Sequence, residues 1–396
     1  MAAALGVLVS CGSVKSGEEV VAASRDSKVV VAYVTSWSEV MPDPQYMTHI
    51  NYAFGHVNES FNGVKIDNEE RLRQIVDLRK QKPELKVLLS IGGWGSGRFS
   101  EMAANDEYRR AFAADCDRVV KEFALDGIDI DWEYPTSSMA NISSSPDDTE
   151  NFTLLMQDIR AAIGNEKELT LATVASARYI DFKAILPSVD FVNIMAYDMA
   201  SAPKHHSALY PSGHSGDITS DGAVTAHLKA GVPPSKLVMG MPFYGRGGDG
   251  YPSFQDYNKV GNTDTQYTEK WDEVAQVPYL ADKNDTLVFG FENPRSLAIK
   301  CQYILDKDLL GGMYWDYSGD NEQGDLRRTV AENLLGKPHK AKVLVLTERG
   351  GQHGGFTDAG LRWLAAEGAK GNFSITEINN ARNITEAYLS QFSLVI

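Results

Sequence analysis

The 396-residue sequence contains no run of eighteen apolar residues, so a helix that spans a membrane is not expected. It also lacks an excess of basic residues, and its formal net charge is −15. Such a charge repels phosphate backbones and anionic lipid surfaces, which argues against nucleic acid as a partner and favours a neutral substrate. Apolar residues at 43% and charged residues at 23% are ordinary for a folded domain and exclude a fibrous or disordered chain.

Cysteine is scarce as well, and the three present are too few for a disulfide framework. Cys116 and Cys301 lie among apolar residues of expected helices, where we expect buried free thiols. Cys11 differs because it follows a short apolar stretch, which resembles the lipobox of bacterial lipoproteins, although no Lys or Arg precedes that stretch. We therefore expect residues 1–27 to be a signal or lipoprotein-like segment and linker. This predicts a bacterial protein that is secreted or anchored by a lipid at Cys11, outside the cytoplasm.

From Val29 onward, short apolar runs alternate with longer amphipathic segments, which is the pattern of repeated strand and helix units around a parallel sheet. Eight runs carry few charges, as expected for strands covered on both faces. They are Val29–Thr35, His49–Gly55, Lys86–Ile91, Gly127–Glu133, Leu169–Ala175, Phe191–Ala196, Leu237–Pro242 and Leu310–Asp316. Eight parallel strands close a TIM (β/α)8 barrel, so we expect one α/β barrel domain over residues 28–337.

Two further segments lie outside the regular repeat. An insertion of about residues 245–292 follows the seventh strand, and an insertion of that length folds locally or builds a binding wall. Residues 338–396 predict a strand, a helix and a second strand, with too little core for independent stability, so we interpret them as the start of a truncated second α/β domain. Their first strand and Gly-rich loop resemble trehalose-utilisation-type domains with an amidotransferase-like sheet. An extension that packs on the barrel is the alternative.

The fourth expected strand carries three carboxylates in alternation. Asp129, Asp131 and Glu133 share one face of the strand, whereas the residues between them are Ile and Trp. Same-face neighbours lie about 6.6 Å apart, so the carboxylates repel one another and lose hydration inside a barrel, which raises their pKa values. Glu133 ends the strand on the side where barrel active sites are built. Asp126 has the opposite parity and is expected to support the start of the strand.

No metal or cofactor is expected. His205 and His206 suggest a metal site, but adjacent histidines rarely bind one ion and no carboxylate or cysteine cluster accompanies them. No Gly-rich stretch follows the strand, turn and helix order of a nucleotide site.

Five motifs in order make the sequence resemble glycoside hydrolase family 18, the chitinase-like family, from about residue 29 to residue 335. They are Ser90-Ile-Gly92-Gly93-Trp94, Asp126 to Glu133, Met195-Ala-Tyr197-Asp198, Gly240-Met-Pro-Phe-Tyr244-Gly-Arg246 and Gly312-Met-Tyr-Trp315. Each motif alone is weak, but five on five expected strands are specific. The resemblance implies hydrolysis of β-1,4 bonds in a polysaccharide that contains N-acetylglucosamine (GlcNAc), such as chitin.

The resemblance also implies a substrate-assisted mechanism. Glu133 would be the general acid, with its pKa raised by Asp131 and by burial. Asp131 would accept a hydrogen bond from the acetamido N–H of the substrate, and Asp129 would exchange a proton or hydrogen bond with Asp131. Tyr197 would donate to the acetamido oxygen, and Asp198 would support the acid.

The remaining residues of these motifs are assigned to the substrate groove. Trp315 would form the floor of the −1 subsite, although core packing is the alternative for a buried aromatic residue. The other candidate substrate-binding residues are Met195, Trp94, Tyr134, Tyr244, Arg246 and Trp37. For Arg246, an acidic neighbour or a surface salt bridge are alternatives to a sugar hydroxyl. Ser90, Gly92 and Gly93 are expected to shape the barrel interior rather than touch substrate.

Two departures from the family pattern lie around the groove. Met199-Ala200-Ser201 replaces Phe-His-Gly, and Phe291-Glu292 replaces the usual Tyr-Asp pair of the insertion. The insertion is also shorter than in deep-cleft members, which predicts a shallower groove and internal cleavage of chains. An endo-β-N-acetylglucosaminidase acting on N-glycans is the alternative enzyme. A chitin-binding lectin without activity is a further alternative, which the presence of Glu133 disfavours.

Overall fold

The computed structural model describes residues 28–248, 251–260, 267–336, 341–347, 354–368 and 373–378, together with residues 384, 389, 392 and 394–396. The chain divides into two compact units, Met1–Gly336 and Lys337–Ile396. Cys11 and the expected leader lie outside the described residues, so the lipid anchor stays a prediction. Within the described part of the chain, no helix is both long and apolar enough to cross a membrane.

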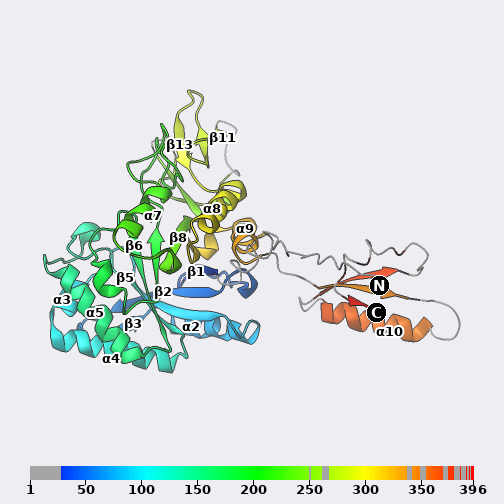
Figure 1. Ribbon diagram of the computed structural model, residues 1–396, viewed down its shortest axis with the longest axis horizontal. Helices are drawn as coiled ribbons and strands as arrows, with labels where there is room; N and C mark the ends of the chain where they lie inside the picture. Colours follow the sequence, from blue (N-terminus) through cyan, green and yellow to red (C-terminus); the bar gives the residue numbers. More distant parts are fainter. Residues whose placement is uncertain are drawn as a thin grey trace, which may run out of the picture. The chain divides into compact units, whose positions relative to one another are not determined.

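The first unit is built on a closed barrel of eight parallel strands, which confirms the predicted TIM barrel (Figure 1). Its strands are β1 (Val29–Thr35), β2 (His49–Val57), β4 (Lys86–Gly92), β5 (Gly127–Asp131), β6 (Glu168–Val174), β7 (Phe191–Met195), β8 (Leu237–Pro242) and β14 (Gly311–Trp315). They follow the order β1-β14-β8-β7-β6-β5-β4-β2, and pairing of β1 with β2 closes the ring. A short strand, β3 (Val64–Ile66), pairs antiparallel with β2. The predicted fourth strand is two residues too long, because β5 ends at Asp131 and Glu133 lies just beyond it.

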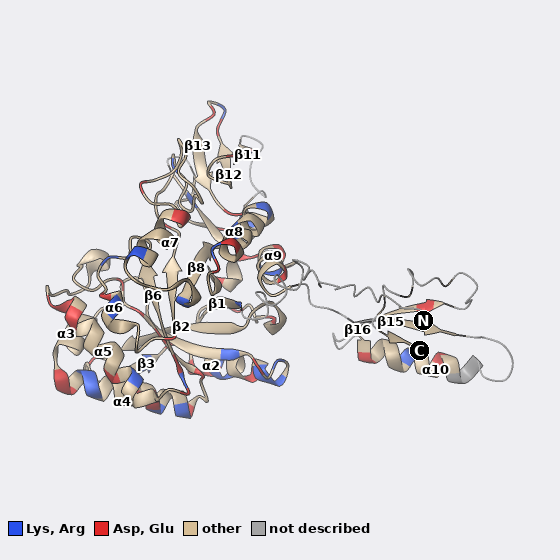
Figure 2. Cartoon of the chain, in the orientation of Figure 1, with Lys and Arg blue, Asp and Glu red and all other residues tan. Residues whose placement is uncertain are grey.

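Helices cover the outside of the barrel. They are α2 (Glu69–Val76), α3 (Phe99–Ala104), α4 (Asp106–Glu122), α5 (Asp148–Ile163), α6 (Phe182–Ile185), α7 (Ser220–Lys229), α8 (Pro294–Asp306) and α9 (Asp325–Leu334). Helix α4 shows why such segments form: the Asn105 side chain caps its first turn, and an apolar face that includes Phe112 and Val119 packs on the strands. Figure 2 shows the charged residues concentrated on the helices and loops, while the barrel strands carry few.

The two cysteines among the described residues belong to this helical layer. Cys116 on α4 and Cys301 on α8 are buried and unpaired. The prediction of free buried thiols is therefore confirmed.

The insertion after β8 folds as a sheet of its own, in agreement with the expectation that it folds locally. Its strands are β9 (Tyr244–Gly247), β10 (Gln255–Asp256), β11 (Thr268–Asp272), β12 (Val277–Ala281) and β13 (Leu287–Gly290), in the order β10-β9-β13-β12-β11. A fully buried ion pair holds the point where the chain returns to the barrel. Lys300 on α8 contacts both Glu292 and the carbonyl of Ser207, and the Ser207 hydroxyl donates to Glu292 at 2.6 Å.

The second unit contains the predicted strand, helix and strand. Strand β15 (Ala341–Leu346) pairs parallel with β16 (Phe373–Ile378) on one side and with β17 (Leu394–Val395) on the other. Helix α10 (Gly354–Glu367) connects β15 to β16 in sequence. Residues 348–353 of the Gly-rich loop lie outside the described residues, so the resemblance to an amidotransferase-like sheet stays a prediction.

Candidate active site

The alternation along β5 separates its side chains as the sequence predicts. Ile128 and Ile130 belong to the core between the strands and helices, and Trp132 stacks on Phe99 of α3 with 5.3 Å between ring centroids. The carboxylates of Asp129 and Asp131 therefore point to the barrel interior. Both residues are buried, with relative exposures of 0% and 4%.

Asp129 is surrounded by donors from four strands. Its Oδ2 accepts hydrogen bonds from the Tyr33 hydroxyl at 2.9 Å and from the Ser90 hydroxyl at 2.8 Å. Its Oδ1 accepts from the Thr170 hydroxyl at 2.5 Å and from the Asn193 amide at 3.3 Å. Burial raises the pKa of Asp129, and these four hydrogen bonds oppose the rise. The protein itself thus satisfies this carboxylate.

Asp131 has the opposite environment. Its Oδ1 is buried and has no hydrogen-bond partner among the described residues. Burial, the charge of Glu133 and the charge of Asp129 all raise the pKa of Asp131 well above its usual range. Gly92 has a φ of +131°, and a Cβ atom there would lie 1.9 Å from the Asp131 carbonyl oxygen. Glycine is therefore required for β4 to approach β5 this closely.

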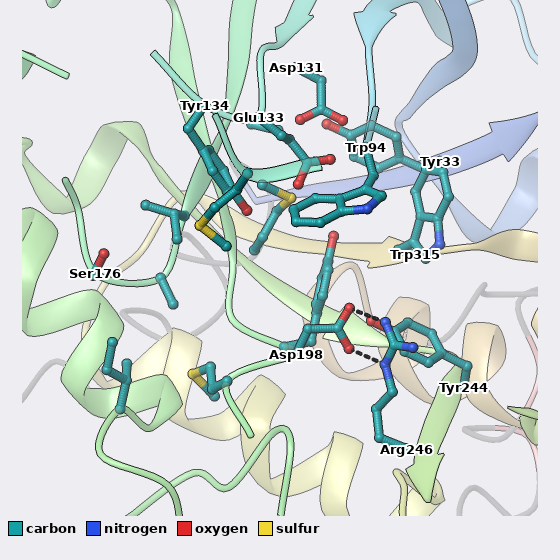
Figure 3. Close-up of a pocket in the computed structure, with 18 of the residues that line it drawn as sticks. Tyr33, Trp94, Asp131, Glu133, Tyr134, Ser176, Asp198, Tyr244, Arg246 and Trp315 are labelled. Carbon is teal, nitrogen blue, oxygen red and sulfur yellow. Dashed lines mark hydrogen bonds and ion pairs between the residues drawn. The ribbon is translucent and has the colours of Figure 1, made fainter. Parts of the chain in front are cut away.

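Glu133 lies just past β5 and points into the cavity with Asp131 (Figure 3). Burial raises the pKa of Glu133 to about 7, opposed by a hydrogen bond with Tyr134 and assisted by the charge of Asp198. The sequence predicted that Asp131 acts on Glu133. Repulsion between Asp131 and Glu133 raises the pKa of Asp131, and because that repulsion is mutual it also disfavours the charge on Glu133, to which the charge of Asp198 adds. Glu133 therefore keeps its proton to a higher pH than an ordinary carboxyl group does.

Asp198 pairs with Arg246 rather than standing alone beside the acid. The guanidinium donates two hydrogen bonds, Nε to Oδ1 at 2.6 Å and Nη2 to Oδ2 at 2.5 Å. His206 is buried and lies 3.5 Å from Asp198. Burial alone raises the pKa of Asp198, but the contacts with Arg246 and His206 outweigh it and hold that pKa well below its usual range. Arg246 therefore contacts an acidic neighbour, which is one of the roles expected for it.

Tyr197 follows β7 and places a phenol next to the carboxylates. Its hydroxyl contacts the sulfur of Met313 at 3.8 Å, a weak acceptor. Burial and the charges of Asp131 and Glu133 raise the pKa of Tyr197 well above its usual range, so the phenol stays a donor. A Cβ atom at Gly240 would lie 2.3 Å from the Ile194 carbonyl oxygen and 2.9 Å from the Tyr197 ring, which explains the glycine on β8.

Aromatic rings form the opposite wall. Trp315 stacks on Phe54 with ring centroids 5.6 Å apart and an interplanar angle of 21°, and it also contacts Tyr33 at 5.6 Å. Trp37 lies 6.5 Å from Trp315 and is 64% exposed. An exposed indole beside a cavity offers a flat apolar face to a ligand.

These side chains line one cavity of about 710 Å³. All the predicted site residues except Asp129 line it: Glu133, Asp131, Tyr197, Asp198, Trp315, Met195, Trp94, Tyr134, Tyr244, Arg246 and Trp37. Asp129 lies deeper, behind Asp131. Further lining residues that were not predicted from the sequence include Tyr33, Phe54, Met139, Arg178, Tyr179 and Phe254. The position of Tyr33 and Phe54 near the ends of the first two strands was a usable signal, whereas the loop residues gave none.

Residues assigned to supporting roles do support the fold. Asp126 accepts from the Val87 N–H at 2.7 Å and pairs with Arg79, so its predicted structural role is confirmed. His205 is buried against Asp272 at 3.2 Å. In the described part of the chain, no group of three or more His, Cys, Asp or Glu residues is arranged to hold a metal ion.

Comparison with known proteins assigns the barrel domain that holds this cavity to a family. The sequence model described as Glycosyl hydrolases family 18 matches residues 29–320, which is the barrel and its insertion. The chain belongs to glycoside hydrolase family 18. Its barrel is therefore a glycoside hydrolase domain, as the order of the five motifs implies.

The chain is also similar to named proteins and to solved structures. Chitinase A1 of Niallia circulans is 30% identical over 76% of this chain, which spans only 58% of that protein. Chitotriosidase-1 of Mus musculus is 31% identical over 74% of each chain. The structure of a family 18 N-acetylglucosaminidase from Paenibacillus barengoltzii is similar with a TM-score of 0.72 and 32% identity, covering 78% of this chain and all of that one.

Proposed function

We propose that this chain hydrolyses β-1,4 bonds in chitin or chitooligosaccharides by a substrate-assisted, retaining mechanism. The observation that carries the proposal is the pair at the end of β5: Asp131 holds a buried oxygen without a donor among the described residues, beside Glu133 whose pKa is about 7. An acetamido N–H on the substrate is the donor that this oxygen suits. GlcNAc carries that group next to the bond to be cut.

Glu133 starts the reaction as the general acid. Because its pKa lies near neutrality, a large fraction of the enzyme holds the proton that the glycosidic oxygen needs. As the bond between the anomeric carbon and that oxygen breaks, the proton moves to the departing sugar. Glu133 then remains as a carboxylate and serves as the base for the second step.

The nucleophile is the acetamido oxygen of the substrate. Asp131 accepts the acetamido N–H, and the Tyr197 hydroxyl donates to the acetamido oxygen, so the oxygen is held in line with the anomeric carbon. The new bond between the acetamido oxygen and the anomeric carbon closes an oxazolinium ring. The carboxylate of Asp131 stabilises the positive charge of this ring. A water molecule, which gives a proton to Glu133, then attacks the same carbon from the face that the leaving group left. The bond between that carbon and the acetamido oxygen breaks, the acetamido group is restored, and the configuration is retained.

Asp129 and Trp315 support these steps from two sides. Four donors fix Asp129 behind Asp131, where it exchanges a proton or hydrogen bond with Asp131. Trp315, held by Phe54 and Tyr33, is the floor on which the sugar of the −1 subsite stacks. Trp37, Trp94, Tyr134, Tyr244 and Met195 extend the contact surface along the groove.

The names of the relatives support a GlcNAc polymer as substrate, since two are a chitinase and a chitotriosidase and one is an N-acetylglucosaminidase. Incubation with chitin oligomers, peptidoglycan fragments and high-mannose N-glycans side by side tests the assignment. We expect the chitin oligomers to be cleaved, with products of several lengths. Release of intact glycans only from the N-glycans would instead establish the endo-β-N-acetylglucosaminidase.

The mechanism has a separate test. A thiazoline mimic of the oxazolinium ring is expected to inhibit hydrolysis of chitin oligomers strongly, because it occupies the contacts of Asp131 and Tyr197. An enzyme that cleaves the oligomers but ignores the thiazoline would use a protein nucleophile instead. An inactive chain that still binds the oligomers would be the lectin.

A further inference from the structure

Arg178 is a cation in the groove that the reaction does not use. Arg178 and Arg246 are the two basic residues among those that line the cavity. Arg246 is engaged by both carboxylate oxygens of Asp198. Arg178 is exposed and has no ion pair or hydrogen bond from its guanidinium to any residue in the part of the chain that the structure describes.

The backbone around Arg178 is strained and fixed. Ala177 has a φ of +56° and Tyr179 has a φ of +74°, so a non-glycine residue adopts the left-handed region on each side of the arginine. Such conformations cost free energy, persist where the surrounding structure imposes them, and cluster at ligand sites. The surroundings here are specific: the Thr149 hydroxyl donates to the Tyr179 carbonyl at 2.9 Å, and the Ala177 N–H donates to the Val174 carbonyl at 3.0 Å. The turn therefore presents Arg178 from a rigid base.

The position of this turn relates it to one side of the scissile bond. The ring of Tyr179 stacks on Tyr134, the residue after Glu133, with centroids 5.5 Å apart and an interplanar angle of 14°. Figure 3 shows Tyr134 and Ser176, which begins the turn, on the side of Glu133 away from Trp315. If Trp315 carries the sugar at the −1 subsite, as the proposed function holds, the turn faces the leaving group.

We propose that Arg178 binds a carboxylate on the sugar of the leaving-group side, so that the preferred substrate is a GlcNAc chain that bears an acidic sugar there. This inference rests on the proposed function and refines its substrate class. A guanidinium without a protein partner among the described residues is suited to a carboxylate, with which it forms two parallel charge-assisted hydrogen bonds. The net charge of −15 does little to oppose an anionic ligand at this position, because charges farther away than about 8 Å are screened at physiological salt.

Two sources of the carboxylate are chemically available, and matched substrates separate them. One arm compares the GlcNAc tetramer with the same tetramer whose reducing-end sugar is oxidised to the aldonic acid. The other arm uses a glycan in which GlcNAc precedes a sugar with a 3-O-lactyl carboxylate, as in muramic acid. The readout is the ratio of kcat/KM on each acidic substrate to kcat/KM on the neutral tetramer, at low and at high salt.

At low salt, we expect the native chain to prefer at least one acidic substrate by about five-fold, the upper range of an exposed ion pair. The Arg178→Gln variant is expected to bring that ratio close to one, and Arg178→Lys to retain part of it. Arg110→Gln is the matched control, because Arg110 on α4 is a 70% exposed arginine outside the cavity and loses the same charge. High salt is expected to weaken the preference of the native chain and to leave Arg178→Gln unaffected.

The outcomes distinguish this inference from the function on which it rests. Cleavage of neutral and acidic substrates with equal kcat/KM by the native chain overturns the role of Arg178 and leaves the proposed function standing. A ratio that Arg110→Gln lowers as much as Arg178→Gln overturns it as well. If no substrate of either kind is cleaved, the proposed function is wrong and the inference falls with it.

Discussion

The two ends of the carboxylate strand differ in whether the protein supplies hydrogen-bond donors to their carboxylates. At Asp129, four protein donors from β1, β4, β6 and β7 occupy both oxygens. At Asp131 and Glu133, two residues and four residues further along, a buried oxygen has no donor in the described part of the chain and the pKa of the acid rises to about 7. The protein itself satisfies Asp129, the closed end, whereas Asp131 and Glu133, the open end, keep their protons and hydrogen bonds free for a substrate. One strand thus combines a structural carboxylate with reactive ones.

Replacing the acid at the open end is expected to have the largest effect. Glu133→Gln keeps the size of the side chain but removes the transferable proton, so we expect kcat on GlcNAc oligomers to fall about 10²- to 10⁴-fold. Binding of the oligomer, measured by calorimetry, should remain close to that of the native chain. A variant that retains more than a tenth of the native kcat would show that Glu133 is not the acid.

Asp131→Asn tests the other open carboxylate. The amide no longer stabilises a positive ring and turns a donor toward the acetamido N–H, so we expect a loss of about 10²-fold in kcat, the cost of misplacing a reacting group. A substrate whose leaving group needs no proton, such as a nitrophenyl glycoside, separates the two variants. It should rescue Glu133→Gln and leave Asp131→Asn slow. Equal rescue of both would remove the distinction between acid and positioning residue.

The pH dependence of kcat/KM tests the protonation of Glu133 without a mutation. Since Glu133 must be protonated to act and its folded pKa is about 7, kcat/KM is expected to fall about ten-fold per pH unit above pH 7. Asp198 contributes no limb in this range because its pKa is held well below its usual value. Replacing Arg246 by Gln should move the limb, since Asp198 then loses the partner that fixes its charge. A profile that stays flat to pH 9 would contradict the assignment.

The free energy of unfolding should change in opposite directions for variants at the two ends. These effects are expected to be the smallest of the series. The folded pKa of Glu133 lies above its unfolded value, so the native chain loses stability as pH rises from about 4.5 through 7. Glu133→Gln removes that loss and is expected to be more stable than the native chain at pH 8, by about 1–3 kcal/mol. Thr170→Val deletes a donor at the closed end and should destabilise by about 1–3 kcal/mol. Urea unfolding at pH 4 and pH 8 measures both, and a stabilised Thr170→Val would contradict the comparison.

Alternation along a strand explains why much of this comparison was predictable from the sequence. The period of two predicts Asp129 and Asp131 inside the barrel and Trp132 outside it, and the observed side chains agree. The barrel followed from eight apolar runs, whose observed ends differ by at most two residues.

Contacts across the chain were not predictable in the same way. The donors to Asp129 lie 39 to 96 positions away in the sequence. The pairing of Arg246 with Asp198 spans 48 positions. No local pattern encodes which of several polar side chains meet in the barrel. Arg178 was missed because an isolated arginine in a loop has no periodicity to mark it.

The insertion sheet has a consequence for how such a groove changes over evolutionary time. Strands β9 to β13 leave the barrel directly after β8 and return at Glu292, where Lys300 and Ser207 hold the junction. Because the return is anchored, hairpins can be lengthened or lost at the β11–β12 end without moving the carboxylates of β5. Selection for a new polymer can therefore act on the wall of the groove while the reacting groups keep their positions.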